Sequence, residues 1–332
     1  MDIGYDEFLA LKARLKAQGR YRNHAENNLY ACFPAELHIP ARVTRGHQED
    51  RVYRCHLVED YLSFMSWPAE YQAFAGASQG VRHSLTVLFE HFRNDRWLLP
   101  QDVYPFYLRE AAGRGLACTT YPTLNEPLHF AGVDPSIRIM LSIYPLKPKG
   151  VYWTEAEQQA CEQWLGGGPD RILILDLVYH TQRTLPAGLK RLYQTNQVIL
   201  LHSLSKMFLL PSHFGVCLLP HTALGRELRE RFKALPKDET RLKAAFNALH
   251  DFQWVHDRVR QQLWNWHVER IAPAFPWGND PRQPLYLFYS PHSFEYWLNE
   301  RGVLAIPESV FGGKANGSVL SSLPDGRPAG SP

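Results

Sequence analysis

The middle of the chain alternates short, continuously apolar runs with segments whose apolar residues recur at helical spacing. The continuous runs are SIRIMLSIYP (136–145), RILILDLVYH (171–180) and QVILLHS (197–203). Helical patterns follow GASQG (76–80) and the capping box that begins at Thr154. Strands without a polar side are buried on both faces, which is typical of a parallel sheet between helical layers. We therefore predict an α/β fold, a three-layer α/β/α domain with a mostly parallel sheet.

The pattern changes near residue 222. From there to about residue 272 the chain is long, charged and helical, and residues 284–313 show a strand, helix and strand pattern. The first twenty residues have an amphipathic helical pattern, and an irregular segment rich in Asn and Pro follows them. We predict a large domain over 46–222 and a smaller α+β lobe built from residues 1–45 and 223–332.

Composition narrows the classes of function that need to be considered. The 332 residues include 36 Lys and Arg and 33 Asp and Glu, so the net charge of +3 does not favour a nucleic-acid or membrane partner. The five cysteines are scattered without a C-x-x-C pair, and the histidines are dispersed, which predicts reduced thiols and no metal site. The N-terminus lacks the apolar core of a signal peptide, and we expect a cytoplasmic protein.

Side chains that could take part in catalysis or ligand binding follow the predicted strands. Asp176 ends RILILD, Tyr179 comes three residues later, and Lys206 follows QVILLHS. Ligands of parallel sheets bind at the carboxyl ends of the strands, and a glycine-rich turn before a helix, such as GASQG, binds phosphate. An acid, a hydroxyl, a lysine and a phosphate site suit a phosphorylated aromatic aldehyde that forms a Schiff base. Tyr104, in DVYPFY, is placed to cover its ring.

The order of GASQG, DVYP, KPKG, DLVY and SLSK resembles the class I/II aminotransferase family, the fold type I enzymes that use pyridoxal 5′-phosphate. The resemblance covers nearly the whole chain, and its specificity comes from the order and spacing of motifs that are individually weak. It implies that Lys206 is the Schiff-base lysine, that Asp176 binds the pyridine nitrogen, and that Tyr179 binds the ring hydroxyl. Tyr104 would stack on the ring.

The resemblance also implies further contacts around the cofactor and the substrate. Ala77 and Ser78 would bind phosphate through a backbone N–H group and a hydroxyl. It implies an amino compound as substrate and a homodimer with a shared active site, to which Tyr53 of the partner copy could contribute. The other implied residues are Gln79, Ser203, Ser205 and His213 for the cofactor and Asn28 and Lys147 for the substrate.

The sequence departs from the family pattern at three positions. Lys147 stands where the family has an asparagine beside the ring hydroxyl. After the lysine, His213 is the polar residue nearest to the position of an arginine that pairs with phosphate. Near the C-terminus, Val319 or Leu320 stands where an arginine would bind the substrate α-carboxylate, and Arg327 comes only later. The substrate then lacks that carboxylate or binds it differently, or the chain has lost catalysis.

Three hypotheses follow from these matches and departures. The first is a pyridoxal-phosphate-dependent enzyme acting on an amino acid or related amine, most simply an aminotransferase of a biosynthetic pathway. The second keeps the cofactor but changes the reaction to that of a lyase, cyclase, decarboxylase or oxidase acting on a modified amino acid. The third is an aminotransferase-like binding protein without catalysis.

Overall fold

The computed structural model describes most of the chain. The described residues are 2–21, 50–124, 126–145, 150–208, 210, 213–236, 238–251, 253–266, 287–313 and 316–321.

A seven-stranded sheet forms the centre of the fold, with the strand order β1-β7-β6-β5-β4-β2-β3. The pairs β2–β3, β2–β4, β4–β5 and β5–β6 are parallel, whereas β7 is antiparallel to both β1 and β6. The predicted mostly parallel sheet is therefore confirmed. The strands are β1 (Ala75–Ser78), β2 (Arg96–Pro100), β3 (Ala117–Tyr121), β4 (Ile139–Ile143), β5 (Ile172–Asp176), β6 (Val198–Ser203) and β7 (Gly215–Leu218).

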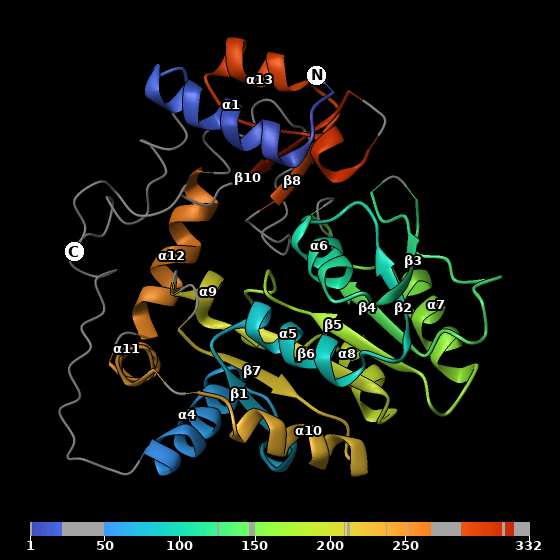
Figure 1. The fold of residues 1–332 in the computed structure, drawn as a ribbon. Helices are drawn as coiled ribbons and strands as arrows, with labels where there is room; N and C mark the ends of the chain where they lie inside the picture. Colours follow the sequence, from blue (N-terminus) through green and yellow to red (C-terminus); the bar gives the residue numbers. More distant parts are fainter. Residues whose placement is uncertain are drawn as a thin grey trace.

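Helices cover both faces of this sheet (Figure 1). Helices α5 (Val81–His91), α6 (Phe106–Gly113) and α10 (Ala223–Lys233) contribute to one apolar cluster. Helices α7 (Glu155–Gly166) and α8 (Ala187–Gln194) contribute to a second. Every residue of β4, β5 and β6 is buried, because successive side chains alternate between these two clusters. This explains why the three runs are apolar without interruption and confirms the predicted three-layer α/β/α arrangement.

The capping box predicted at Thr154 is present at the start of α7. The Thr154 hydroxyl accepts a hydrogen bond from the Glu157 backbone N–H at 3.3 Å, and the Glu157 carboxylate accepts one from the Thr154 N–H at 2.8 Å. Both bonds satisfy N–H groups that have no partner within the helix. The helix therefore begins where the sequence predicts.

The N-terminal helix lies beside the C-terminal elements (Figure 1). The backbone of Ile3, just before α1 (Tyr5–Ala17), exchanges two hydrogen bonds with the Ser309 hydroxyl, at 3.1 and 3.0 Å. Ser309 belongs to the 3₁₀ helix η4 (Glu308–Phe311). The other elements here are β8 (Leu287–Ser290), α13 (Phe294–Arg301), β9 (Ile306–Pro307) and β10 (Ser318–Ser321), whose strands form an antiparallel sheet in the order β8-β10-β9.

Helix α4 (Asp50–Phe64) and the 3₁₀ helix η1 (Ala69–Phe74) lie at the β1 end of the large sheet, and α11 (Glu239–His250) packs on α4. Helix α12 (Gln253–Trp266) follows α11 and contacts the short helix α9 (Leu204–Met207) (Figure 1). His250 on α11 contacts Asp60 on α4 at 2.7 Å, and Phe232 of α10 packs directly on Gly76 of β1. The domain boundary at residue 222 stays a prediction.

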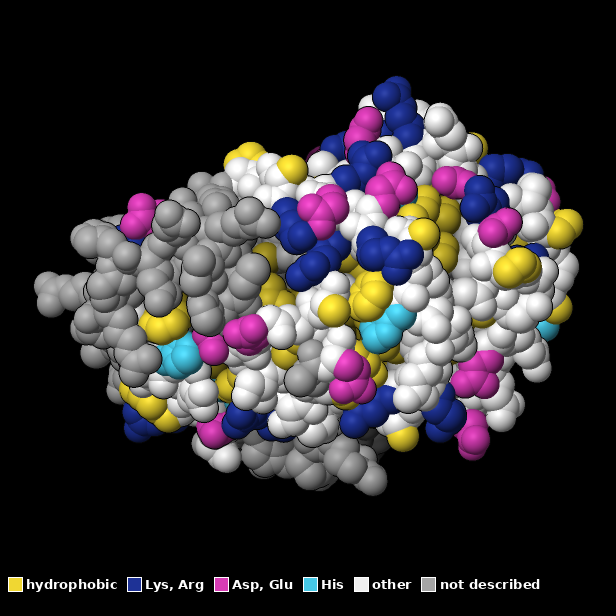
Figure 2. Space-filling model, turned by 90° about the horizontal axis from the view of Figure 1, so that it is seen from below, with side chains coloured by type: hydrophobic (Ala, Val, Ile, Leu, Met, Phe, Trp, Pro, Cys, Tyr) yellow, Lys and Arg dark blue, Asp and Glu magenta, His cyan; other side chains and the backbone are white. Residues whose placement is uncertain are grey.

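Charge is mixed over the surface. Figure 2 shows Lys and Arg side chains interspersed with Asp and Glu side chains over the described part of the face seen from below. None of the described helices has the length and apolarity that a bilayer crossing requires.

Three histidines are buried on the α8 side of the sheet. His202 Nε2 donates to the His180 carbonyl at 2.6 Å, so its Nδ1 is the acceptor for the Tyr61 hydroxyl. Burial lowers the pKa of His180 to about 4 and that of His202 to about 3, and it lowers the pKa of His256 in the same direction. These imidazoles are therefore neutral in the folded protein at neutral pH.

The burial of these neutral histidines predicts that the folded protein becomes less stable in acid. Histidines in the unfolded chain take up protons near pH 6.5, whereas folded His180 and His202 do so only near pH 4 and pH 3, so the unfolded state binds more protons in between. The free energy of unfolding should therefore fall as the pH is lowered from about 7.5 to about 5.5. Urea unfolding of His202→Gln should show a slope with pH that is smaller by about 1 kcal/mol per pH unit. A slope in His202→Gln equal to that of the unchanged protein would contradict this account.

Candidate functional site

A cavity of ≈ 380 Å³ opens at the carboxyl ends of β5 and β6. Asp176 is the last residue of β5 and Ser203 is the last residue of β6. Because these strands are parallel neighbours, their ends meet at one edge of the sheet. Seven of the residues predicted for the site line this cavity: Gln79, Tyr104, Asp176, Tyr179, Ser203, Ser205 and Lys206.

Asp176 is a carboxylate without exposed surface. The Tyr107 hydroxyl donates to its Oδ2 at 2.5 Å, and the Val178 backbone N–H donates to its Oδ1 at 2.8 Å. These donors compensate for the loss of water that burial imposes on a charged group. Burial first, and then the charge of Asp176, raise the pKa of Tyr107 well above its ordinary value, so Tyr107 keeps the proton that it donates.

Sequence reasoning missed Tyr107, although a signal was present. Tyr107 is the second residue of α6 and lies three positions after Tyr104, which precedes the helix. The Tyr107 backbone N–H donates to the Tyr104 carbonyl at 3.3 Å, so a turn brings the two residues together. Both side chains line the cavity. The spacing within DVYPFY therefore places two tyrosines at the site, where we predicted one.

Lys206 and Tyr179 are neighbours in the cavity. Lys206 belongs to the short helix α9 (Leu204–Met207), which directly follows β6, and its Nζ lies 5.1 Å from the centroid of the Tyr179 ring. Burial raises the pKa of Tyr179, and the positive charge of Lys206 opposes this rise. The amine and the phenol are thus held in one electrostatic environment, next to Asp176.

Two hydroxyl groups line the cavity beside the lysine. Ser203 caps α9, and its Oγ lies 2.8 Å from the Oγ of Ser205. Hydroxyl groups both donate and accept, so this pair can bind an anion without adding charge to the cavity.

The amino end of α5 also borders the cavity, through Gln79, Gly80 and Val81. Gly80 has φ 118° and ψ 175°, a conformation that side chains with Cβ rarely adopt. The first N–H groups of a helix lack partners within the helix and carry partial positive charge, which attracts anions. This end of α5 therefore suits a phosphate group in the cavity.

The Ser78 hydroxyl fixes this turn from outside the cavity. It donates to the Gly80 carbonyl at 3.1 Å, accepts from the Gly80 N–H at 3.2 Å and lies 2.8 Å from the Ser84 hydroxyl. The Ser78 hydroxyl is therefore hydrogen-bonded within the turn in this structure, and its contact with phosphate stays a prediction.

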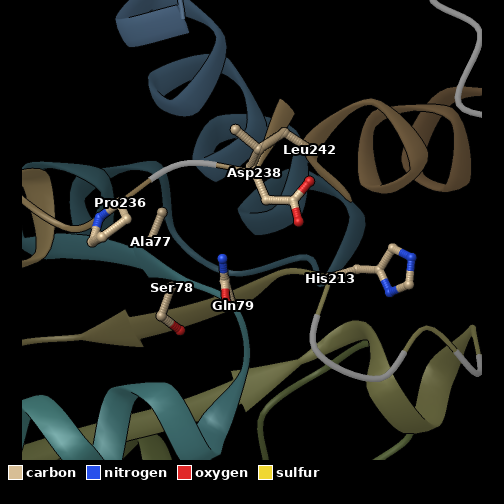
Figure 3. Close-up of a pocket in the computed structure, with 7 residues that line it drawn as sticks. All are labelled: Ala77, Ser78, Gln79, His213, Pro236, Asp238 and Leu242. Carbon is tan, nitrogen blue, oxygen red and sulfur yellow. The ribbon is translucent and has the colours of Figure 1, made fainter. Parts of the chain in front are cut away.

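Ala77, Ser78 and His213 line a second, smaller pocket beside Pro236, Asp238 and Leu242, where Figure 3 draws them. Its volume is ≈ 10 Å³, which is about the space of one water molecule. The structure thus does not bring these three predicted residues into the larger cavity. Gln79 lines both spaces.

Helix α11 holds the Gln79 side chain. Arg241 Nη1 donates to Gln79 Oε1 at 3.5 Å, and its Nε pairs with Asp238 Oδ2 at 3.0 Å. Figure 3 shows the Asp238 carboxylate directed into the space between Gln79 and His213. A charged pair beside the smaller pocket thus contacts a residue of the larger cavity, since Asp238 lines the smaller pocket and Gln79 lines both spaces.

Tyr104 lies at the cavity rim under an arginine that sequence reasoning missed. The Arg82 Cζ atom lies 5.2 Å from the centroid of the Tyr104 ring and 4.6 Å from that of Phe106, and Arg82 Nη2 donates to the Tyr104 hydroxyl. The Tyr5 hydroxyl of α1 donates to the same oxygen at 3.3 Å. Arg82, Phe106 and Tyr104 all line the cavity.

Other predicted positions are not part of this cavity. Asn28, Lys147 and Arg327 lie outside the described residues, as does the side chain of Tyr53. Val319 and Leu320, which stand where the family pattern has an arginine, are fully buried in β10.

Comparison with solved structures identifies proteins of the same fold. An aminotransferase from Mycobacterium tuberculosis matches with a TM-score of 0.67 and 16% sequence identity, over 96% of this chain and 91% of that one. The aminotransferase AspB from Helicobacter pylori matches with a TM-score of 0.65 and 15% identity, over 88% and 83%. A pyridoxal-phosphate-bound C–S lyase from Staphylococcus hominis matches with a TM-score of 0.62 and 14% identity, over 84% and 79%.

These likenesses confirm the fold that the sequence resemblance implies. No family model matches the chain, and its sequence matches no curated protein. The fold is thus shared with aminotransferases and with a lyase.

A glycine in β7 tests the rigidity of the α5 turn. A Cβ atom added to Gly215 would lie 2.7 Å from the Gly80 Cα and 2.9 Å from the His202 carbonyl oxygen. Gly215→Ala should therefore displace the turn and lower the free energy of unfolding by about 1–3 kcal/mol. Gly113→Ala is the matched control, because its Cβ would meet no atom within 4 Å, and it should stabilise the protein by about 0.4–1 kcal/mol in the same denaturant titration.

Proposed function

We propose that the chain is a pyridoxal-phosphate-dependent enzyme that acts on an amino acid or a related amine, most simply as an aminotransferase. The observation that carries this proposal is the placement of Lys206, Tyr179 and the buried carboxylate of Asp176 around one cavity. The likeness in fold to aminotransferases and to a pyridoxal-phosphate-bound lyase supports it.

The cavity fits the cofactor in size and in chemistry. Its ≈ 380 Å³ falls within the range of small-molecule sites, which is about 300–1,000 Å³. A lysine, a satisfied buried carboxylate, a phenol and a helix amino end are the groups that a phosphorylated pyridine aldehyde requires. When bound, pyridoxal phosphate supplies an aldehyde that condenses with amines and a ring that withdraws electrons from the attached carbon.

Several residues that line the cavity would have separate roles toward the cofactor. Asp176 would hold a proton on the ring nitrogen, and Tyr107 and the Val178 N–H keep its carboxylate fixed in place. Lys206 Nζ would hold the aldehyde carbon and, once a substrate amine displaces it, take a proton from the substrate Cα. Tyr179 would donate to the ring oxygen, and Tyr104 would cover the ring.

Lyase chemistry is the second candidate. The likeness in fold to a C–S lyase favours it. The apolar residues Val319 and Leu320 in β10 also favour it, because they stand where the family pattern has the arginine that binds the substrate α-carboxylate. Product analysis with an added keto acid separates the two reactions, because transamination consumes the keto acid and lyase chemistry does not. Among candidate amines, turnover that consumes the keto acid supports the aminotransferase.

The predicted homodimer is also part of this proposal. The active site would then be shared between two copies of the chain, as the family resemblance implies. Sedimentation of the purified protein at several concentrations tests this expectation, and a monomer at all of them would contradict it.

Removal of the amine tests the assignment of Lys206. Lys206→Ala should abolish the visible absorbance that added pyridoxal phosphate develops on the protein, together with any turnover, because no other amine is expected to hold the aldehyde in this cavity. Lys190→Ala, on α8, serves as the control and should leave both unchanged. Full absorbance in Lys206→Ala would refute the assignment.

Removal of the Tyr107 hydroxyl tests the support of Asp176. Tyr107→Phe should weaken pyridoxal phosphate binding and lower the free energy of unfolding by about 1–3 kcal/mol, because a buried carboxylate loses a donor. Tyr121→Phe removes another buried hydroxyl, which donates to the Leu141 carbonyl, and should lower stability without changing cofactor affinity. Equal cofactor affinities of the two variants, measured by absorbance titration, would speak against a role of Tyr107 in the site.

A further inference from the structure

Two cationic side chains stand among the described residues that line the cavity, and the proposed function uses only one of them. Lys206 is assigned to the aldehyde. Arg82, the second residue of α5, has no role in the chemistry described so far. It lies beyond the Gly80 turn, on the same border of the cavity as the helix amino end.

The rim of the cavity orients the Arg82 guanidinium. The group lies against the rings of Tyr104 and Phe106, 5.2 and 4.6 Å from their centroids, and donates to the Tyr104 hydroxyl. That hydroxyl is in turn bound by Tyr5 of α1, at 3.3 Å. A guanidinium has five N–H donors in a planar fork, so a fork held by two rings is set up to bind oxyanions with two parallel bonds.

The expected ligands carry negatively charged groups and therefore need a cationic group in the cavity. A phosphorylated cofactor and an amino acid substrate both carry oxyanions, which bind stably in a partly closed cavity when they are paired. Asp176 is negative in the proposed function, the hydroxyls of Ser203 and Ser205 are neutral, and His213 lines the smaller pocket. In β10 the buried Val319 and Leu320 stand where the family pattern has an arginine.

We propose that Arg82 binds an oxyanion of the ligand in this cavity, either the phosphate of the cofactor or the carboxylate of an amino acid substrate. The proposal rests on the proposed function, and Tyr104 acts in it as the positioning residue that holds the guanidinium. The field of Arg82 reaches the centre of the site, since its charge lowers the pKa of Tyr107 against the effects of burial and Asp176.

The first test measures ligand affinity rather than turnover. Absorbance titrations with pyridoxal phosphate and with pyridoxal, which lacks the phosphate, compare the unchanged protein with Arg82→Gln and Arg82→Lys. If Arg82 binds the phosphate, Arg82→Gln weakens pyridoxal phosphate binding by about tenfold or more and leaves pyridoxal unaffected. Arg82→Lys recovers part of the loss, because it keeps the charge but not the fork.

The second arm tests the carboxylate. Each protein is saturated with pyridoxal phosphate, and its spectral response is titrated with amino acids and with the amines that remain after their decarboxylation. If Arg82 binds the substrate carboxylate, Arg82→Gln weakens the response to an amino acid by about tenfold or more and leaves the matching amine unchanged.

Arg109→Gln is the matched control. Arg109 lies on α6 near the same rim, stacks on Tyr5 at 5.3 Å and pairs with Asp6 at 2.6 Å, but it does not line the cavity. A loss in Arg82→Gln that Arg109→Gln does not share supports a specific site. Unchanged affinities in both arms, or equal losses in both variants, would overturn the role of Arg82. If the unchanged protein itself takes up no pyridoxal phosphate, the proposed function fails, and the role of Arg82 fails with it.

Discussion

A carboxylate without exposed surface, at the end of a central strand, is the constraint on which the site depends. Burial of a charged group is costly unless hydrogen-bond donors replace water, so Asp176 requires the Tyr107 hydroxyl and the Val178 N–H. The first donor comes from α6 and the second from the chain just after β5. The parallel pairing of β5 with β6 then brings Lys206 to the same edge of the sheet. The site is thus assembled around one buried carboxylate at the carboxyl ends of two parallel strands.

The turn before α5 adds a second constraint. Gly80 has a backbone conformation that favours glycine, the Ser78 hydroxyl closes the turn, and Gly215 of β7 lies against it without a Cβ. This close approach fixes the amino end of α5 at the cavity. The position of this turn therefore depends on the strand order as well as on the turn residues, because the contact between Gly215 and Gly80 requires β7 to lie between β1 and β6.

The site residues that lie at the ends of buried strands could be predicted from the sequence. Asp176 and Lys206 follow continuous apolar runs, so their positions at one sheet edge follow from the pattern of burial. The hydrogen bonds of the Ser78 hydroxyl within the turn could not be read from the sequence, because they depend on the local backbone conformation, and its predicted contact with phosphate stays a prediction. His213 was expected near the phosphate, yet it lies beside residues of α11 that are distant in sequence.

Arg82 was missed for a related reason. Its position at the site depends on α5 lying beside Tyr104 and Phe106 at the cavity rim, and such a contact between segments that are separate in the chain leaves little trace in a single sequence. Such contacts also link the two ends of the chain to the site. Tyr5 of α1 reaches Tyr104, while the adjoining backbone of Ile3 binds Ser309 among the C-terminal elements. The rim of the cavity is therefore built from segments that are distant in sequence.

The most direct test of the account is borohydride reduction of the protein after incubation with pyridoxal phosphate, followed by mass mapping of its peptides. Reduction converts a C=N bond between the cofactor and a lysine into a stable attachment that survives digestion. The account predicts a pyridoxyl group on Lys206 and on no other lysine at comparable yield. A protein without the adduct, or one labelled mainly at other lysines, would contradict the assignment of the cavity as a pyridoxal phosphate site.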